Sequence, residues 1–191
     1  SIVLNGRDLR RLTPKQLEEG RGNEVAMVFQ DPTTSLNPAF TVGSQIAEVL
    51  RTKQGLSGKQ AWSRVVELID RVGIPRPEER ARAYPHELSG GMAQRIAIAR
   101  ALSCNPSLLI ADEPTTALDV TIQAEILALI DRLKRETGTA VMFITHDMAV
   151  VAQMADRVVV MHQGRKVEEG PVERLFEAPQ HAYTLALLAA V

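Results

Sequence analysis

The chain has 191 residues, 45% of them hydrophobic, which is enough to bury a sizeable core in one or two lobes. Its 22 basic and 23 acidic residues give a formal net charge of -1, which provides no strong basic field for nucleic acid or an anionic membrane surface. The single cysteine, Cys104, excludes an intrachain disulfide and predicts a small buried residue in a reducing compartment.

No apolar run approaches the ~20 residues that span a bilayer, and no basic-then-apolar signal peptide opens the chain. The sequence begins with Ser1 and goes straight into the strand-like residues 2–4, a start that fits a fragment of a longer protein. Residues 14–19 then predict a helix, and residues 25–29 predict a second apolar strand. Two prolines, an asparagine and a serine predict a loop over residues 30–38.

The hydrophobic period changes after residue 42 from that of strands to that of helices. Val65, Ile69 and Val72 recur at helical spacing and are typical of this stretch. We therefore predict an all-helical subdomain over residues 39–83, inserted into the surrounding fold.

From residue 84 onward the chain alternates between helices and apolar strands. The predicted helices cover 92–103, 120–136 and 147–154, and the predicted strands cover 107–112, 139–145 and 156–161. Repeated strand–helix–strand units imply an α/β fold, in which helices pack on a parallel sheet. We assign residues 1–38 and 84–170 to this core and residues 171–191 to a C-terminal helical tail.

One motif opens the helix predicted at 92–103: residues 88–95 read Leu-Ser-Gly-Gly-Met-Ala-Gln-Arg. Unpaired backbone N–H groups at a helix start carry partial positive charge and suit a phosphate. Gly90 and Gly91 permit close approach of the backbone, and Ser89 adds a hydroxyl. Taken alone, this triplet predicts only an N-cap and a flexible turn, but its flanking residues favour an anion site.

A second motif ends an apolar strand in two adjacent carboxylates, because residues 108–113 read Leu-Leu-Ile-Ala-Asp-Glu. Asp112 and Glu113 thus lie at the carboxyl end of a buried strand, where open parallel sheets bind ligands. The alternative is a pair of solvated carboxylates, which four preceding apolar residues disfavour. An anion site and a site for a metal ion and water together indicate a nucleoside triphosphate. No segment fits G-x-x-x-x-G-K-[ST], the loop that cradles phosphates.

These motifs resemble those of the ATP-binding subunits of ABC transporters, with the signature motif at 88–91 and the Walker B strand at 108–113. The resemblance implies a P-loop NTPase-type parallel sheet that binds ATP and Mg²⁺. It implies that Asp112 holds Mg²⁺, mostly through water, and that Glu113 polarises the attacking water.

The same resemblance assigns roles to further positions. It implies that the segment Ser89–Gly91 binds the γ-phosphate held by an opposite subunit, so that the chain acts as a dimer. Gln30 matches the Q-loop glutamine, which touches Mg²⁺ and water and couples the site to the helical lobe. His146 matches the switch histidine, which contacts the γ-phosphate and orients the water. Asp119 matches the D-loop aspartate, which reaches across the dimer.

The resemblance covers essentially the whole chain and points to the oligopeptide and dipeptide importer ATPases, a group that includes nickel importers. One departure is Ala182, which stands where the family usually has proline, in a segment remote from catalysis. The group implies a second ATP-binding subunit in a homo- or heterodimer, membrane permease subunits and, indirectly, a solute-binding protein. It implies no nucleic acid, and it places the protein at the cytoplasmic face of the cell membrane. The stretches that carry this resemblance are 29–38, 84–88, 117–123 and 179–184.

Family members begin well before the residue that matches Ser1, and their front carries the phosphate loop, so we expect the 191-residue chain to be inactive alone. The strand of that loop would lie inside the sheet, and we expect its absence to promote oligomerisation or aggregation. Two alternatives stay open: a non-catalytic binding or structural module, and a soluble ABC protein of DNA repair or translation. The second type carries long coiled-coil insertions and basic surfaces, whereas residues 39–83 predict a compact insertion.

Overall fold

The computed structural model describes residues 1–116 and 118–189, apart from the side chain of Thr33. Ala117, in the predicted segment 117–123, and the last two residues of the predicted tail lie outside this description. The chain divides into two compact units, Ser1–Met142 and Phe143–Val191.

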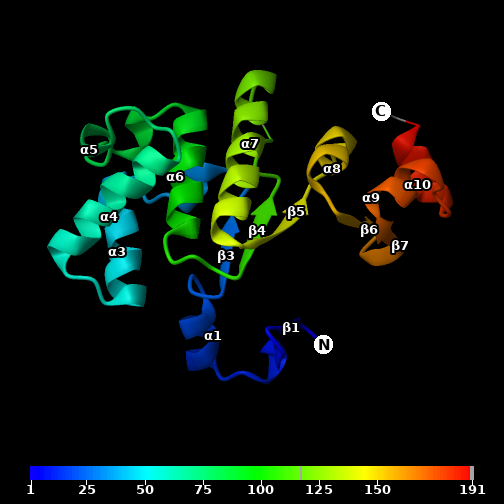
Figure 1. The fold of residues 1–191 in the computed structure, drawn as a ribbon, viewed down its shortest axis with the longest axis horizontal. Helices are drawn as coiled ribbons and strands as arrows, with labels where there is room; N and C mark the ends of the chain where they lie inside the picture. The colour runs from blue at the N-terminus through cyan, green and yellow to red at the C-terminus, as the bar shows by residue number, and fades with distance from the viewer. Residues whose placement is uncertain (117, 190–191) are drawn as a thin grey trace. The chain divides into compact units, whose positions relative to one another are not determined.

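A parallel pair of strands forms the centre of the first unit. Strands β3 (Val25–Val28) and β4 (Leu108–Asp112) run parallel, with Val28 beside Ala111. Strand β5 (Ala140–Ile144) completes a sheet with the order β3-β4-β5 (Figure 1). Because side chains alternate between the two faces of a sheet, one face is buried, and its members in β3 and β4 are Ala26, Val28, Leu109 and Ala111. The predicted α/β fold with a parallel sheet is confirmed.

Two helices of the first unit follow the two motifs. Helix α6 (Gly90–Leu102) contacts both β3 and helix α7 (Val120–Thr137). A helix that is apolar around most of its surface is buried, as in α6, which buries Ala93, Ile96, Ala97, Ile98, Ala99 and Leu102. Helix α7 buries a single stripe, formed by Ile126, Leu127, Leu129, Ile130 and Leu133. It ends at Gly138, whose φ of 69° is the left-handed conformation of a helix C-cap.

The stretch between β3 and α6 is helical. Its helices are α2 (Pro32–Ser35), α3 (Val42–Gln54), α4 (Gly58–Arg71) and α5 (Pro77–Arg80). The hydroxyls of Thr41 and Ser57 cap α3 and α4 by accepting backbone N–H bonds from the first turns. The predicted helices are present, but α2 lies in the segment predicted as a loop, where Pro32 begins a single helical turn.

Short elements complete the first unit. Two strands, β1 (Val3–Leu4) and β2 (Arg7–Asp8), form an antiparallel pair, and a 3₁₀ turn follows at Leu9–Arg11. Helix α1 (Pro14–Gly20) begins with a capping box between Thr13 and Gln16. A second 3₁₀ turn, Pro85–Glu87, leads into the signature motif.

The described part of the second unit contains a hairpin and three short helices. Strands β6 (Arg157–His162) and β7 (Arg165–Pro171) pair antiparallel across the Gln163-Gly164 turn, where both residues have positive φ. The prediction that strand 156–161 belongs to the parallel sheet is therefore wrong for the described residues, since a tight hairpin leads directly to an antiparallel partner. The helices are α8 (Met148–Met154), α9 (Val172–Glu177) and α10 (Ala182–Leu188).

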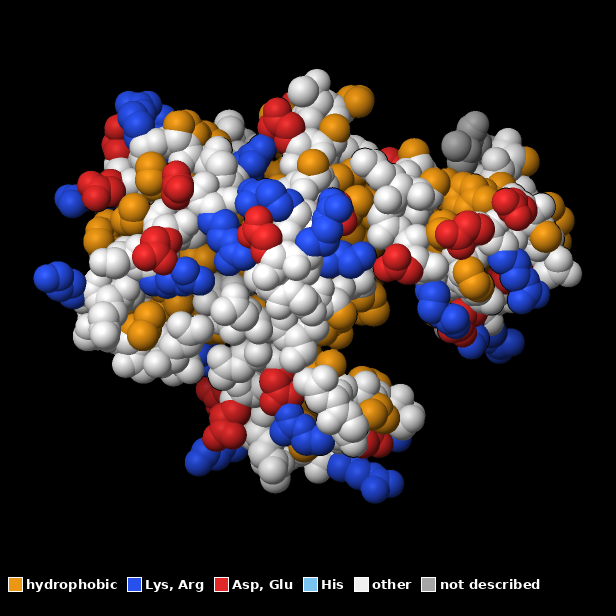
Figure 2. Space-filling view, in the orientation of Figure 1, with side chains coloured by type: hydrophobic (Ala, Val, Ile, Leu, Met, Phe, Trp, Pro, Cys, Tyr) orange, Lys and Arg blue, Asp and Glu red, His pale blue; other side chains and the backbone are white. Residues whose placement is uncertain are grey.

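The surface carries charges of both signs, as the balanced numbers of basic and acidic residues predict. On the face shown in Figure 2, Lys and Arg side chains are interspersed with Asp and Glu side chains. Among the described helices, none has the length and apolar content needed to cross a bilayer. Cys104 is half-buried, and burial raises the pKa of its thiol, so the reactive thiolate is a minor form at neutral pH.

Candidate functional site

The second motif places two half-buried carboxylates where β4 ends. Asp112 is the last residue of the strand, and Glu113 is the first residue of the turn that follows. Glu113 has a φ of 45°, in the left-handed region that side chains other than glycine disfavour by roughly 1–2 kcal/mol. The chain therefore turns sharply at the residue that carries the second carboxylate, and surrounding contacts must hold this conformation.

Two side chains donate hydrogen bonds to the Glu113 carboxylate. Nε2 of Gln30 lies 2.9 Å from Oε2 of Glu113, and Oγ1 of Thr116 lies 2.9 Å from the same oxygen. Gln30 follows β3 by two residues, and because β3 and β4 are parallel neighbours, their carboxyl ends meet at one edge of the sheet. The structure thus brings together Gln30 and Glu113, which were predicted from separate segments. Thr116 was not predicted.

The signature motif forms the start of α6. Ser89 is the N-cap, and its Oγ accepts a hydrogen bond of 3.3 Å from the backbone N–H of Met92. Ser89 and Gly90 are exposed, so the first N–H groups of the helix are accessible from solvent. A Cβ added at Gly90 would lie 3.8 Å from the nearest atom, whereas one added at Gly91 would lie 2.8 Å from Cγ2 of Ile122. Gly90 therefore leaves the backbone open, and Gly91 allows close packing against α7.

Asp119 lies at the start of α7, beside this motif. Its Oδ1 accepts a hydrogen bond of 3.0 Å from the N–H of Ile122, so the exposed Asp119 is the N-cap of α7. Since Gly91 packs against Ile122, the N-termini of α6 and α7 lie close together. The structure therefore places Asp119 near Ser89, Gly90 and Gly91 as parts of one surface region.

A buried glutamine joins the two motifs. Gln94, on α6, is only 1% exposed, and its Nε2 donates a hydrogen bond of 2.7 Å to the carbonyl oxygen of Pro114. Pro114 directly follows Glu113 in the turn. In the sequence Gln94 is only a residue that flanks the signature motif, and no spacing rule indicates its contact 20 residues away.

His146 belongs to the second unit. It is exposed and lies between β5 and α8. The following residue, Asp147, caps α8 by accepting bonds from Ala149 and Val150, and its own N–H donates to Oγ1 of Thr145 at 3.0 Å. These contacts fix the backbone on both sides of His146 within its unit. Its action together with Glu113 stays a prediction.

The donor set at the end of β4 fits Mg²⁺. Carboxylate and amide oxygens are hard ligands, and Asp112 and Gln30, the predicted metal ligands, supply them at one edge of the sheet. The described residues contain no group of three or more His, Cys, Asp or Glu side chains arranged to enclose a metal ion. Mg²⁺ needs no such cage, because it usually keeps several waters and takes its remaining ligands from substrate phosphates.

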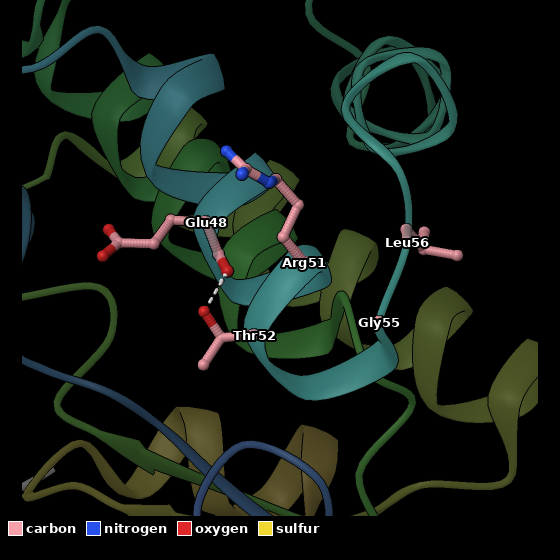
Figure 3. Close-up of a pocket in the computed structure, with 5 residues that line it drawn as sticks. All are labelled: Glu48, Arg51, Thr52, Gly55 and Leu56. Carbon is pink, nitrogen blue, oxygen red and sulfur yellow. Dashed lines mark hydrogen bonds between the residues drawn. The ribbon is translucent and has the colours of Figure 1, made fainter.

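Two surface hollows lie away from these residues. One, of about 460 Å³, is lined by residues at the end of α3 and just beyond it, where Oγ1 of Thr52 donates to the Glu48 carbonyl (Figure 3). The second, of about 290 Å³, includes Phe40 and Arg100 in its lining. Neither is lined by a residue predicted to bind nucleotide, so the candidate site is the edge of the sheet together with the start of α6. The lining of the first hollow comprises Glu48, Arg51, Thr52, Gly55 and Leu56.

Known transport proteins are similar to this chain in sequence. The oligopeptide transport ATP-binding protein OppD of Bacillus subtilis is 54% identical over 190 residues, which cover 100% of this chain and 53% of that protein. The glutathione import ATP-binding protein GsiA of Escherichia coli is 57% identical over 184 residues, covering 96% of this chain and 30% of that protein. The chain thus spans about half the length of OppD and less than a third of GsiA.

The chain also matches solved structures and a family profile. A dimeric ATP-binding cassette in a post-hydrolysis state, bound to ADP and Pi, superposes with a TM-score of 0.77 at 30% identity. The superposition covers 88% of this chain and 72% of that one. A family profile described as ABC transporter matches residues 1–116, more than half of the chain. With the cassette fold and both motifs in place, the chain belongs to the ABC transporter family.

Proposed function

We propose that this chain supplies catalytic and dimer-contact residues of an ATP-hydrolysing subunit in an importer of peptides or similar small solutes. The observation that carries the proposal is the Glu113 carboxylate at the end of β4, held by Gln30 and joined to the signature helix through Gln94. A carboxylate at a parallel-sheet edge beside an exposed helix N-terminus matches what phosphoryl transfer to water requires.

Glu113 acts as the base that orients the attacking water and accepts its proton. Gln30 and Thr116 hold its carboxylate by donating to one oxygen, which restricts rotation of the side chain. Asp112 and Gln30 would hold Mg²⁺, and the ion would supply positive charge to offset charge on the phosphate oxygens. His146 contacts the γ-phosphate from the loop that follows β5.

The signature motif serves the opposite active site. The exposed N-terminus of α6, with Ser89, Gly90 and Gly91, binds the γ-phosphate of ATP held by a second subunit, and Asp119 reaches the same interface. The dimeric state of the similar cassette supports this arrangement. ATP therefore closes two subunits face to face, and hydrolysis reopens them.

The transport role rests on the relatives. Their names describe oligopeptide transport and glutathione import, so peptides and small peptide-like solutes are the proposed cargo class. The helices of residues 42–80 would pass dimer closure to membrane permease subunits at the cytoplasmic face, with a solute-binding protein acting indirectly.

A direct test uses a form of the protein extended at its N-terminus to include a G-x-x-x-x-G-K-[ST] loop, called here the extended form. We expect it to hydrolyse ATP with Mg²⁺, and we expect Glu113→Gln to reduce turnover by about a hundredfold or more while leaving ATP binding intact. The change keeps size but removes the base, so the variant should accumulate a dimer in ATP. Parental turnover in Glu113→Gln, with only monomer on size exclusion, would show that Glu113 is not the catalytic carboxylate. An extended form that binds no ATP would favour a non-catalytic module.

A further inference from the structure

Among the residues that the structure describes, two glutamines are buried, and they differ in how well their polar atoms are satisfied. Gln45 accepts a hydrogen bond of 2.9 Å from the N–H of Asn37 and donates to the carbonyls of Asn37 and Phe40 at 2.9 and 3.0 Å. Gln94 donates once, to Pro114, and its Oε1 is buried without a partner among the described residues. A buried unpaired acceptor is unfavourable, so a purely structural role explains Gln45 better than Gln94.

The hydrogen bond that Gln94 donates is accepted within a strained turn. Glu113 is in the left-handed region, and the N–H of Thr116 donates to its carbonyl oxygen at 3.1 Å, which closes the turn. Pro114 lies inside this turn, and its carbonyl oxygen points to Nε2 of Gln94 at 2.7 Å. Gln94 therefore fixes the backbone one residue beyond the carboxylate that Gln30 and Thr116 hold.

Gln94 also lies close to the start of α6. Gln94 lies four residues after Gly90, and residues four apart lie on the same side of a helix. Gln94 is buried, so its side chain has little freedom to adjust if the helix moves. A shift or rotation of α6 therefore moves the amide that holds the Pro114 carbonyl, and with it the turn that presents Glu113.

We propose that Gln94 is a positioning residue that couples the signature end of α6 to the orientation of the Glu113 carboxylate in the same subunit. This inference rests on the proposed function, in which the N-terminus of α6 binds nucleotide held by the partner. A phosphate docked at Gly90 then sets the position of α6, and through Gln94 it sets the base of the subunit's own site. The two active sites of the dimer are thereby linked through one buried side chain.

The test compares two buried glutamines. Gln94→Met removes the donor and the unpaired oxygen at nearly constant volume, and Gln45→Met is the matched control. In the 191-residue chain labelled with ¹³C and ¹⁵N, Gln94→Met should shift the NMR signals of the Glu113 carboxyl group and the Thr116 amide, whereas Gln45→Met should not. In the extended form, Gln94→Met should lower kcat by about tenfold to a hundredfold, with little change in KM for ATP.

A third variant keeps the proposal falsifiable if Gln94→Met does not fold. In Gln94→Glu, the protonated acid can donate to the Pro114 carbonyl, but the carboxylate cannot. Its Glu113 signals should match the parent below the pKa of the new acid and depart from it above that pKa.

The outcomes separate this link from the proposed function. An extended form without ATPase activity would count against the proposed function, while the NMR comparison would still decide whether the link exists. Unchanged Glu113 signals in Gln94→Met, or a kcat loss no larger than that of Gln45→Met, would overturn the proposal. Glu113 signals in Gln94→Glu that differ from those of the parent by the same amount below and above the pKa of the new acid would also overturn it.

Discussion

The two glycines of the signature motif allow a matched comparison, because alanine is tolerated differently at each position. At Gly91, the added methyl group would lie 2.8 Å from Cγ2 of Ile122, about 1 Å inside the normal separation of carbon atoms. Ile122 is β-branched and lies in the first turn of α7, so its χ1 angle has little freedom to move the methyl away. At Gly90, the nearest atom would be Cδ2 of Leu118 at 3.8 Å, an ordinary contact.

The expected free energies follow from two opposing effects. Replacing glycine by alanine inside a helix is favourable by up to about 1 kcal/mol. Overpacking costs about 1–3 kcal/mol. Gly91→Ala should therefore reduce the free energy of unfolding by roughly 0.5–2 kcal/mol, whereas Gly90→Ala should leave it unchanged or raise it slightly. The double variant Gly91→Ala with Ile122→Ala should be less destabilised than the sum of the single changes by about 1–2 kcal/mol, since the clash is then gone.

Urea unfolding monitored by the fluorescence of Trp62, which lies in the same compact unit, measures these differences directly. The m-value should stay constant across the set, so that the midpoints report stability. A Gly91→Ala variant at least as stable as Gly90→Ala would refute the reasoning. Strict additivity of Gly91→Ala and Ile122→Ala would show that the two side chains do not meet.

Three further predictions concern charge, dimer closure and turnover. Nε and Nη2 of Arg71 donate hydrogen bonds to Oε2 of Glu136 at 3.0 and 2.8 Å, which lowers the pKa of Glu136 below its ordinary 4.5. The ionised Glu136 therefore stabilises the folded chain above pH 4.5, and this stabilisation is lost as the pH falls through the lower pKa of the folded state. Glu136→Gln should therefore destabilise the chain in urea more than Glu18→Gln at pH 7 but not at pH 2, and an equal gap at both pH values would contradict this. In the extended form, Ser89→Arg should abolish ATP-driven dimerisation on size exclusion while nucleotide titration shows intact ATP binding; unchanged dimerisation would refute the facing-subunit arrangement. The 191 residues contain no G-x-x-x-x-G-K-[ST] loop, so we expect them to release phosphate from ATP no faster than their Glu113→Gln variant does. Steady Mg-dependent phosphate release that Glu113→Gln abolishes would contradict this prediction.

Hydrophobic periodicity predicted the elements that bury apolar side chains. The strands at 25–29 and 107–112 and the helix at 120–136 are found within one to two residues of their predicted bounds, because burial on one face requires a regular pattern. Strand β7 was missed because Arg165–Glu169 is rich in charge and has no apolar alternation. Pairing with β6, rather than its own composition, makes this segment a strand.

The site shows a similar division between local and tertiary information. The sequence indicates Asp112 and Glu113 because a carboxylate pair at the end of an apolar strand is a local pattern. It does not indicate that Gln94 reaches Pro114, since that contact depends on how α6 packs against the strands. The joint action of His146 with these residues stays a prediction, as do the assigned roles of the other site residues.

Four positions in and just after the signature motif have separable physical roles in this structure. The Ser89 hydroxyl stabilises the helix start, Gly90 keeps the N–H groups open, Gly91 allows α7 to approach, and the Gln94 amide holds the turn beyond Glu113. Ser89 and Gly90 are exposed and Gly91 is half-buried, so these three are open to a phosphate, whereas Gln94 is buried. Changes at Gln94 should therefore alter the presentation of Glu113 without removing a phosphate contact. A motif that looks like a single anion site in the sequence therefore combines a binding surface with the packing that carries its position to the catalytic carboxylate.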